Sequence, residues 1–187
     1  MKWSKAKHEL QQKSKGELVG YLKRLFDLSA ENKSFFEANL AGNDGVSPKY
    51  YKQEISESVN PGIESPIDLR RGRKAISSYR KAAPNDLWGR VDLMIHFVEQ
   101  GADFTLEYGD INGPFYDSLC RMINSIVDLS PQLSSVEHAY LAKRFEDLDS
   151  ITKDQIGWGF SDHISDATTT VRVSPVTSGA IRRITGR

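Results

Sequence analysis

The chain has 187 residues, with 25 basic and 25 acidic side chains, and 39% of its residues are hydrophobic. This composition excludes a collagen-like or disordered polymer, and the sequence has no run of 18 apolar residues that would predict a membrane-spanning helix. A chain of this length buries enough surface to fold without disulfides or a structural metal. The single cysteine, Cys120, and a charged start without an apolar leader favour a soluble, cytoplasmic protein.

Apolar residues recur every three to four positions along most of the chain, which is the spacing of one helix face. Ser14 and Glu17 form a capping box that starts one helix, and Asp68 can cap another. The pattern predicts about seven helices, over residues 14–29, 35–40, 47–59, 68–83, 86–101, 115–130 and 134–149. Gly101 can either interrupt or end the helix that begins near Asp86.

No segment before the C-terminal tail alternates apolar and polar residues at the period of a strand. Helices joined by short breaks predict an all-α fold of stacked αα-hairpins, with residues 1–166 as a single domain. The pattern fits a compact bundle and a short solenoid equally well. Residues 167–187 are rich in Thr, Ser, Val and Gly and are basic, so we expect a mobile tail there.

Two of the predicted helices share a short internal echo at an offset of 120 residues. Six residues between Ser14 and Leu28 recur at equivalent positions between Ser134 and Leu148. The echo indicates either a helical repeat or a coincidence, because amphipathic helices draw on the same few residue types.

Charge is distributed unevenly along the chain. Residues 1–25 carry seven basic and two acidic groups, a balance of +5, whereas residues 103–162 carry four basic and eleven acidic groups, a balance of −7. The helix over 68–83 has a basic face opposite its apolar stripe, made of Arg70, Arg73, Lys74, Arg80 and Lys81. Such a face is typical of a surface that binds phosphates or an acidic protein. It is also typical of a solvated face that is neutralised by the acidic residues 103–162 of the same chain.

The N-terminal region has a second basic feature. A basic helix over residues 5–12, a tight break and the capped helix from Ser14 resemble the helix, loop, helix of small SAP-type DNA-binding motifs. The resemblance implies contact with nucleic acid, while an ordinary helical hairpin gives the same pattern.

Arg90 and His96 are separated by five residues, a spacing that resembles the HEPN superfamily of all-α ribonucleases. The resemblance implies that Arg90 stabilises phosphate charge and that His96 moves a proton, across a dimer interface. About one such match is expected by chance in a chain of this composition. The same helix carries a polar stripe made of Asp92, His96, Glu99 and Asp103. We expect this stripe to be a solvated surface, and its residues are too spread out to form a metal site.

Glycines flank large aromatic residues at 108–112 and at 156–160. Glycines in such positions let a backbone pass close to a packed ring, which indicates structural closure of the C-terminal helices. The alternative is an aromatic anchor for a partner, formed by Trp158 and Phe160. The sequence has no nucleophile elbow, phosphate loop or paired catalytic carboxylates at a recognisable spacing, and no cofactor is expected.

Several segments together resemble a family of small bacterial helical proteins known only as a domain of unknown function. The resemblance is carried by Ser14, Lys15, Glu17, Leu18, Lys74, Ala75, Ile76, Ser77, Leu93, Met94, Phe97, Val98, Glu99, Gly101, Tyr108, Gly109, Asp110, Ile111, Asn112, Phe115, Tyr116, Gly157, Trp158, Gly159 and Phe160. It spans about residues 3–165 and implies an all-α fold and a bacterial origin. It implies no activity, substrate or catalytic residue.

These observations favour a non-enzymatic protein-interaction module that works through residues 70–81 and has another protein as its partner. Binding of nucleic acid through the basic helix 69–83 and the basic N-terminus is the alternative. A ribonuclease that uses Arg90 and His96 is a third hypothesis. We expect no contact with a membrane.

Overall fold

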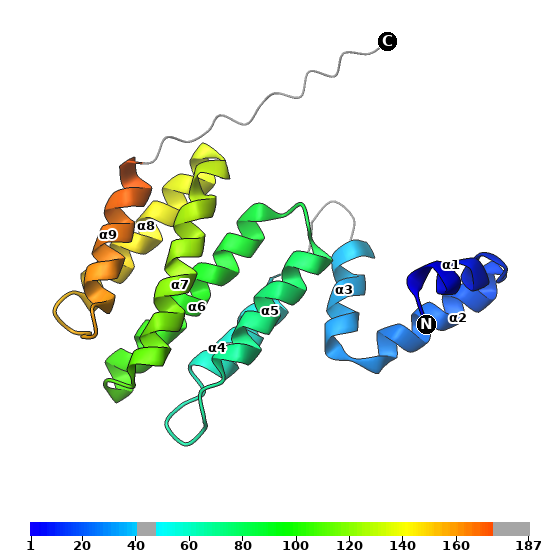
Figure 1. Ribbon diagram of the computed structural model, residues 1–187, viewed down its shortest axis with the longest axis horizontal. Coiled ribbons are helices and arrows are strands. Elements are labelled where there is room, and N and C mark those ends of the chain that lie inside the picture. The colour runs from blue at the N-terminus through cyan, green and yellow to red at the C-terminus, as the bar shows by residue number, and fades with distance from the viewer. Residues whose placement is uncertain (41–47, 174–187) are drawn as a thin grey trace, which may run out of the picture. The chain divides into compact units, whose positions relative to one another are not determined.

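The computed structural model describes residues 1–40 and 48–173 (Figure 1). All secondary structure in these two ranges is helical, which confirms the predicted all-α fold. The chain divides into two compact units, Met1–Ser47 and Pro48–Arg187. The single domain expected over residues 1–166 spans both units and stays a prediction. Within the described ranges, no helix is both long and apolar enough to cross a membrane.

The first unit contains α1 (Trp3–Gln11), α2 (Lys15–Leu28) and α3 (Ala30–Leu40). The predicted capping box starts α2: the Ser14 hydroxyl accepts from the Glu17 N–H at 3.2 Å, and the Glu17 carboxylate accepts from the Ser14 N–H at 2.9 Å. Phe26 and Phe36 join α2 to α3, with ring centroids 5.8 Å apart. The turn predicted at 42–45 lies outside the described residues.

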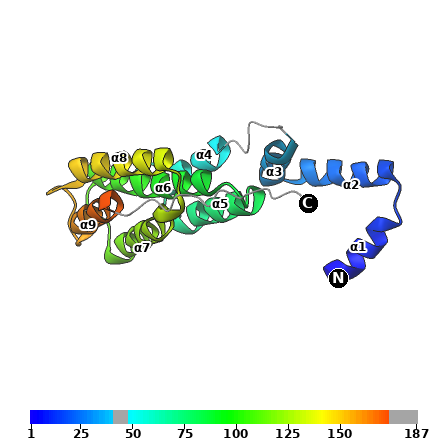
Figure 2. The same cartoon turned by 90° about the horizontal axis from the view of Figure 1, so that it is seen from above.

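The second unit is organised around one long helix. Its helices are α4 (Lys49–Val59), α5 (Leu69–Ala82), α6 (Leu87–Tyr108), α7 (Gly113–Leu129), the 3-10 turn η2 (Ser130–Gln132), α8 (Ser135–Thr152) and α9 (Phe160–Val173). α6 contacts α4, α5, α7 and α8, and α9 packs against α7 and α8 (Figures 1 and 2). Val91, Leu93, Ile95 and Phe97 of α6 are fully buried, so this helix forms the centre of the core.

Gly101 neither ends nor interrupts α6, which continues to Tyr108. Its role is to let two helices approach closely: a Cβ atom at Gly101 would lie 2.7 Å from the methyl carbons of Leu119 on α7. The helix ends instead at Gly109, whose φ of 91° lies in the left-handed region that glycine tolerates.

Helix α9 corrects the predicted tail. The composition predicts a mobile tail from residue 167, but α9 extends to Val173 and buries Ala167, Thr168 and Val171. These side chains continue the helical spacing of Ile164, a pattern that the threonine-rich composition obscured. Residues 174–187 lie outside the described residues.

Candidate functional site

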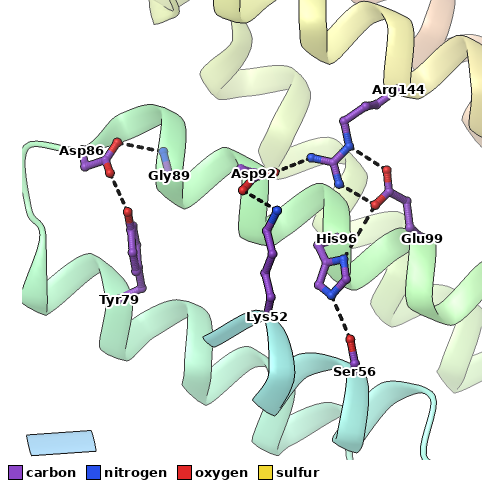
Figure 3. Close-up of polar contacts among 9 residues, drawn as sticks. All are labelled: Lys52, Ser56, Tyr79, Asp86, Gly89, Asp92, His96, Glu99 and Arg144. Carbon is purple, nitrogen blue, oxygen red and sulfur yellow. Dashed lines mark hydrogen bonds and ion pairs between the residues drawn. The ribbon is translucent and has the colours of Figure 1, made fainter. Parts of the chain in front are cut away.

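A polar network ties α4, α6 and α8 together (Figure 3). The Arg144 guanidinium on α8 donates to Asp92 Oδ1 at 2.5 Å and to Glu99 Oε1 at 2.7 Å, and its third nitrogen contacts Glu99 Oε2. Lys52 Nζ on α4 lies 2.8 Å from Asp92 Oδ2. The side chains of Arg144 and Asp92 are only 14% and 12% exposed. The two carboxylates of α6 are therefore paired with cations from both neighbouring helices.

This network corrects the expectation of a solvated stripe on α6. Asp92 is buried, and His96 and Glu99 are half-buried between α4 and α8, so only Asp103 of the four predicted residues remains exposed. The reason is that cations from α4 and α8 neutralise the carboxylates, which allows polar residues to face other helices. Among the residues that the structure describes, no group of three His, Cys, Asp or Glu side chains could hold a metal ion.

His96 connects the same network to a serine on α4. Its Nε2 lies 2.9 Å from Ser56 Oγ, and its Nδ1 lies 3.8 Å from Glu99 Oε2. The order of serine, histidine and carboxylate is that of a hydrolase triad. However, both Glu99 oxygens accept from Arg144, and Ser56 lies inside α4, where backbone N–H groups bond within the helix and cannot bind an oxyanion. We therefore assign His96 a structural role.

Burial and charge act in opposite directions on Glu99. Burial raises its pKa, but contacts with His96 and Arg144 outweigh burial and hold the pKa below its usual value. Asp103 follows on the same helix as an exposed residue, and its pKa is raised by partial desolvation of its carboxyl group and by the nearby charge of Glu99. Glu99 therefore stays ionised at neutral pH, and its charge is compensated by Arg144.

A second polar contact fixes the start of α6 (Figure 3). Asp86 is the N-cap: its Oδ1 accepts from the Gly89 N–H at 2.8 Å, and its Oδ2 accepts from the Tyr79 hydroxyl of α5 at 2.5 Å. Burial and the Asp86 carboxylate raise the pKa of Tyr79, which keeps this hydroxyl a donor. The contact joins α5 to α6 at a position that the sequence predicted as a helix start.

The basic face of α5 is exposed, as predicted. All five of its predicted residues are exposed, namely Arg70, Arg73, Lys74, Arg80 and Lys81. Arg73 Nη1 donates to Ser118 Oγ of α7 at 2.5 Å. Arg71, at the edge of this face, is different: it is ion-paired with Glu54 at 3.0 Å and Glu57 at 2.9 Å on α4. Arg71 is therefore neutralised by carboxylates of α4.

A cavity of about 340 Å³ lies between α5 and α7, and Arg73 of α5 lines it. Its other lining residues are Ser118, Arg121, Met122 and Ser125 of α7. Arg121 could not be predicted as part of this site from the sequence, because a lone arginine in an acidic stretch carries no local signal. Only the packing of α5 and α7 against the same helix, α6, brings the two arginines to one cavity.

The structure does not bring Arg90 and His96 together within one chain. Six residues along an α-helix correspond to side-chain directions about 120° apart. His96 contacts Ser56 of α4. Arg90 instead lies near Arg80 of α5, and the pKa of Arg90 is lowered mainly by burial and further by the charge of Arg80. A pair that acts across a dimer interface is not tested by one chain, so the ribonuclease hypothesis stays a prediction.

The predicted aromatic anchor is wrong for one of its two residues. Phe160 is fully buried, because it begins α9 and packs against Tyr116 with ring centroids 5.7 Å apart. Trp158 is 62% exposed and stacks on Tyr116 at 6.1 Å. Its φ of 58° lies in the left-handed region that few non-glycine residues adopt. Trp158 alone remains available to a partner.

The first unit contains an apolar groove that the sequence analysis did not single out. It has a volume of about 650 Å³ and is lined by Met1, Ala6, Glu9, Leu10, Lys13, Tyr21, Arg24, Leu25 and Leu28. Figure 2 shows α1 and α2 diverging from the turn between them. No residue of α1 or α2 is buried, so the apolar stripe of α2 remains open. The sequence predicted a helix over residues 14–29 but not which of its apolar side chains stay uncovered.

Comparison with known proteins returned no protein-family model, no curated protein and no solved structure that matches this chain. The resemblance to a bacterial family of unknown function therefore stays a prediction. Function must be inferred from the residues and contacts of this chain.

Proposed function

We propose that the protein is a non-enzymatic interaction module whose α1–α2 groove binds an acidic amphipathic helix of a partner protein. The observation that carries this proposal is the open apolar groove. Tyr21, Leu25 and Leu28 of α2 line it together with Leu10 of α1, and none of them is buried. An amphipathic helix laid in such a groove is a common mode of protein recognition.

The energetic argument concerns the leucines. Burying one leucine side chain contributes about 1.5–3 kcal/mol, and soluble proteins seldom leave a contiguous apolar patch of several such residues uncovered. Leu25 is about half exposed and Leu28 more so, although α2 has a well-formed capping box and ordinary helical geometry. Helix α2 is therefore formed although its leucines stay exposed. A ligand that covers the groove buries these leucines and gains the corresponding free energy of burial.

Charge indicates the kind of helix that fits. Residues 1–25 have a balance of +5, and the groove itself is lined by two cations, Lys13 and Arg24, and by one carboxylate, Glu9. One of the two acids in this segment, Glu17, is already engaged by Ser14 and by Lys13 at 3.4 Å. A partner helix with leucines along one face and glutamates beside them therefore matches both the apolar floor and the surrounding charge.

The test uses a synthetic probe, an 18-residue fluorescein-labelled helix with leucines at helical spacing and glutamates elsewhere. Fluorescence anisotropy should show binding to the full chain and a loss of about tenfold or more with Leu25→Asp. Val19→Asp is the matched control, because Val19 lies on the same helix and is exposed but does not line the groove. Circular dichroism checks that both variants keep the helix content of the wild type.

Three outcomes would overturn the proposal. The first is that the wild-type chain does not bind the probe, and the second is that Leu25→Asp and Val19→Asp lose the same affinity. The third is that a lysine-for-glutamate version of the probe binds equally well, because charge then plays no part. Binding to anionic lipid vesicles without binding to the peptide would identify a membrane surface instead.

A further inference from the structure

We propose that α5 and α7 bind the phosphate backbone of a nucleic acid, with Arg73 and Arg121 as the central contacts. The site lies in the second unit and is separate from the α1–α2 groove. It extends the expected basic face of α5 by a residue from another helix.

The cavity between the two helices has the composition of an anion site. Two guanidinium groups and two hydroxyl groups line it, with Met122 as its apolar member, and no carboxylate is among the lining residues. Two positive charges that share one cavity repel each other, and an anion between them converts this repulsion into attraction. Arginine is also the side chain whose donor geometry best matches phosphate oxygens.

Each arginine has donors available for a ligand. Arg73 is positioned by one hydrogen bond, from Nη1 to the buried Ser118 hydroxyl, which holds the guanidinium at the cavity. An arginine carries five N–H donors, so most of the Arg73 donors remain. Within the described part of the chain, the Arg121 guanidinium forms no hydrogen bond or ion pair, and even Asp117, one turn before it, does not pair with it.

Arg71 is an example of an arginine whose charge is paired within the fold. That side chain lies on the same helix as Arg73, and Glu54 and Glu57 of α4 neutralise it. No equivalent carboxylate lines the cavity on the α7 side. The contrast indicates that the charge of Arg73 and Arg121 is left for a ligand.

The length of the basic face favours a polymer over a single phosphate. From Arg70 to Lys81 the exposed cations of α5 extend over about 16 Å of helix, at about 1.5 Å per residue. Near the C-terminal end of α5, Arg80 lies close enough to the half-buried Arg90 of α6 that its charge helps to lower the pKa of Arg90. One phosphoserine would occupy only the cavity, whereas a nucleic-acid backbone carries phosphates along the whole row. No aromatic side chain lies on this face, so we expect binding without base stacking.

The test measures binding of the full chain to a labelled 20-nucleotide RNA and to a 20-base-pair DNA duplex between 50 and 200 mM NaCl. The Arg73→Gln, Arg121→Gln variant should bind at least about tenfold more weakly at the lower salt, and its logarithmic salt slope should be smaller by about two. The control is Arg71→Gln, Arg172→Gln, which removes the same charge from arginines that are ion-paired elsewhere. It should keep the wild-type slope.

The proposal is overturned if the wild-type chain binds neither probe, or if both double variants lose the same affinity, because net charge alone then explains binding. It is also overturned if a phosphoserine peptide binds and the nucleic acids do not. The single variant Arg121→Glu, at an exposed position, guards against a folding defect in the double variant and should also weaken binding at least about tenfold. Leu25→Asp, which tests the groove, should leave nucleic-acid binding unchanged.

Discussion

Lys143 and Arg144 are adjacent in the sequence and have opposite surroundings. Lys143 is exposed and pairs at 2.5 Å with Asp147 on its own helix. Arg144 points inward and holds two carboxylates of α6. An exposed pair gains little, because water solvates the free ions almost as well. A buried arginine is different, since its removal leaves its partners charged and poorly solvated.

We therefore predict that Arg144→Ala lowers the free energy of unfolding by about 3–5 kcal/mol, because it leaves Glu99 with His96 alone and Asp92 with Lys52 alone. Urea denaturation followed by circular dichroism measures the change. Lys143→Ala is the control and should unfold at the wild-type urea concentration. Equal midpoints for the two variants would show that the network contributes nothing to stability.

At the scale of elements, α2 and α8 show what the internal echo encodes. Both start with a capping box, and both carry the same ion pair at the same distance from that cap, Lys23 with Asp27 and Lys143 with Asp147. Their packing differs completely: α8 buries Phe145 together with two leucines, whereas α2 buries no residue. The echo therefore specifies two helices and not a structural repeat.

The cap of α8 gives a prediction at this scale. The Ser134 hydroxyl accepts from the Glu137 N–H, and the Glu137 carboxylate accepts from the Ser134 N–H at 2.8 Å. Ser134→Ala removes the first of these bonds and should lower the free energy of unfolding by about 1 kcal/mol. Thermal unfolding followed at 222 nm measures it. Ser135→Ala, at the next and equally exposed position, should leave the transition unchanged, and a matching decrease there would contradict the cap assignment.

The features that sequence predicted correctly are local ones. The caps at Ser14 and Asp68 and the apolar stripes of the long helices are determined within one or two turns of chain. The polar stripe of α6 was misjudged because its cations come from helices far away in the sequence. Arg121 and the α1–α2 groove were missed for the same reason: whether a side chain faces a partner, a cavity or nothing depends on packing.

At the scale of the whole molecule, the division of the chain has a testable consequence. The polar network and the core around α6 lie entirely within the second unit. We predict that residues 48–187 fold without the first 47, with a thermal transition within a few degrees of that of the full chain. Differential scanning calorimetry of both proteins measures this. A fragment without a cooperative transition would show that residues 1–166 form one inseparable domain, as the sequence analysis expected.

The long-range reach of the Arg144 network also bears on the order of folding. Most helix contacts in the second unit join neighbours in the chain, such as α4 with α5, α6 with α7 and α8 with α9. The pair of Asp92 and Arg144 instead closes a loop of 52 residues. Closing loops of this size costs entropy that only a largely assembled core repays. We therefore expect the network to form late in folding, so that it slows unfolding more than it speeds folding.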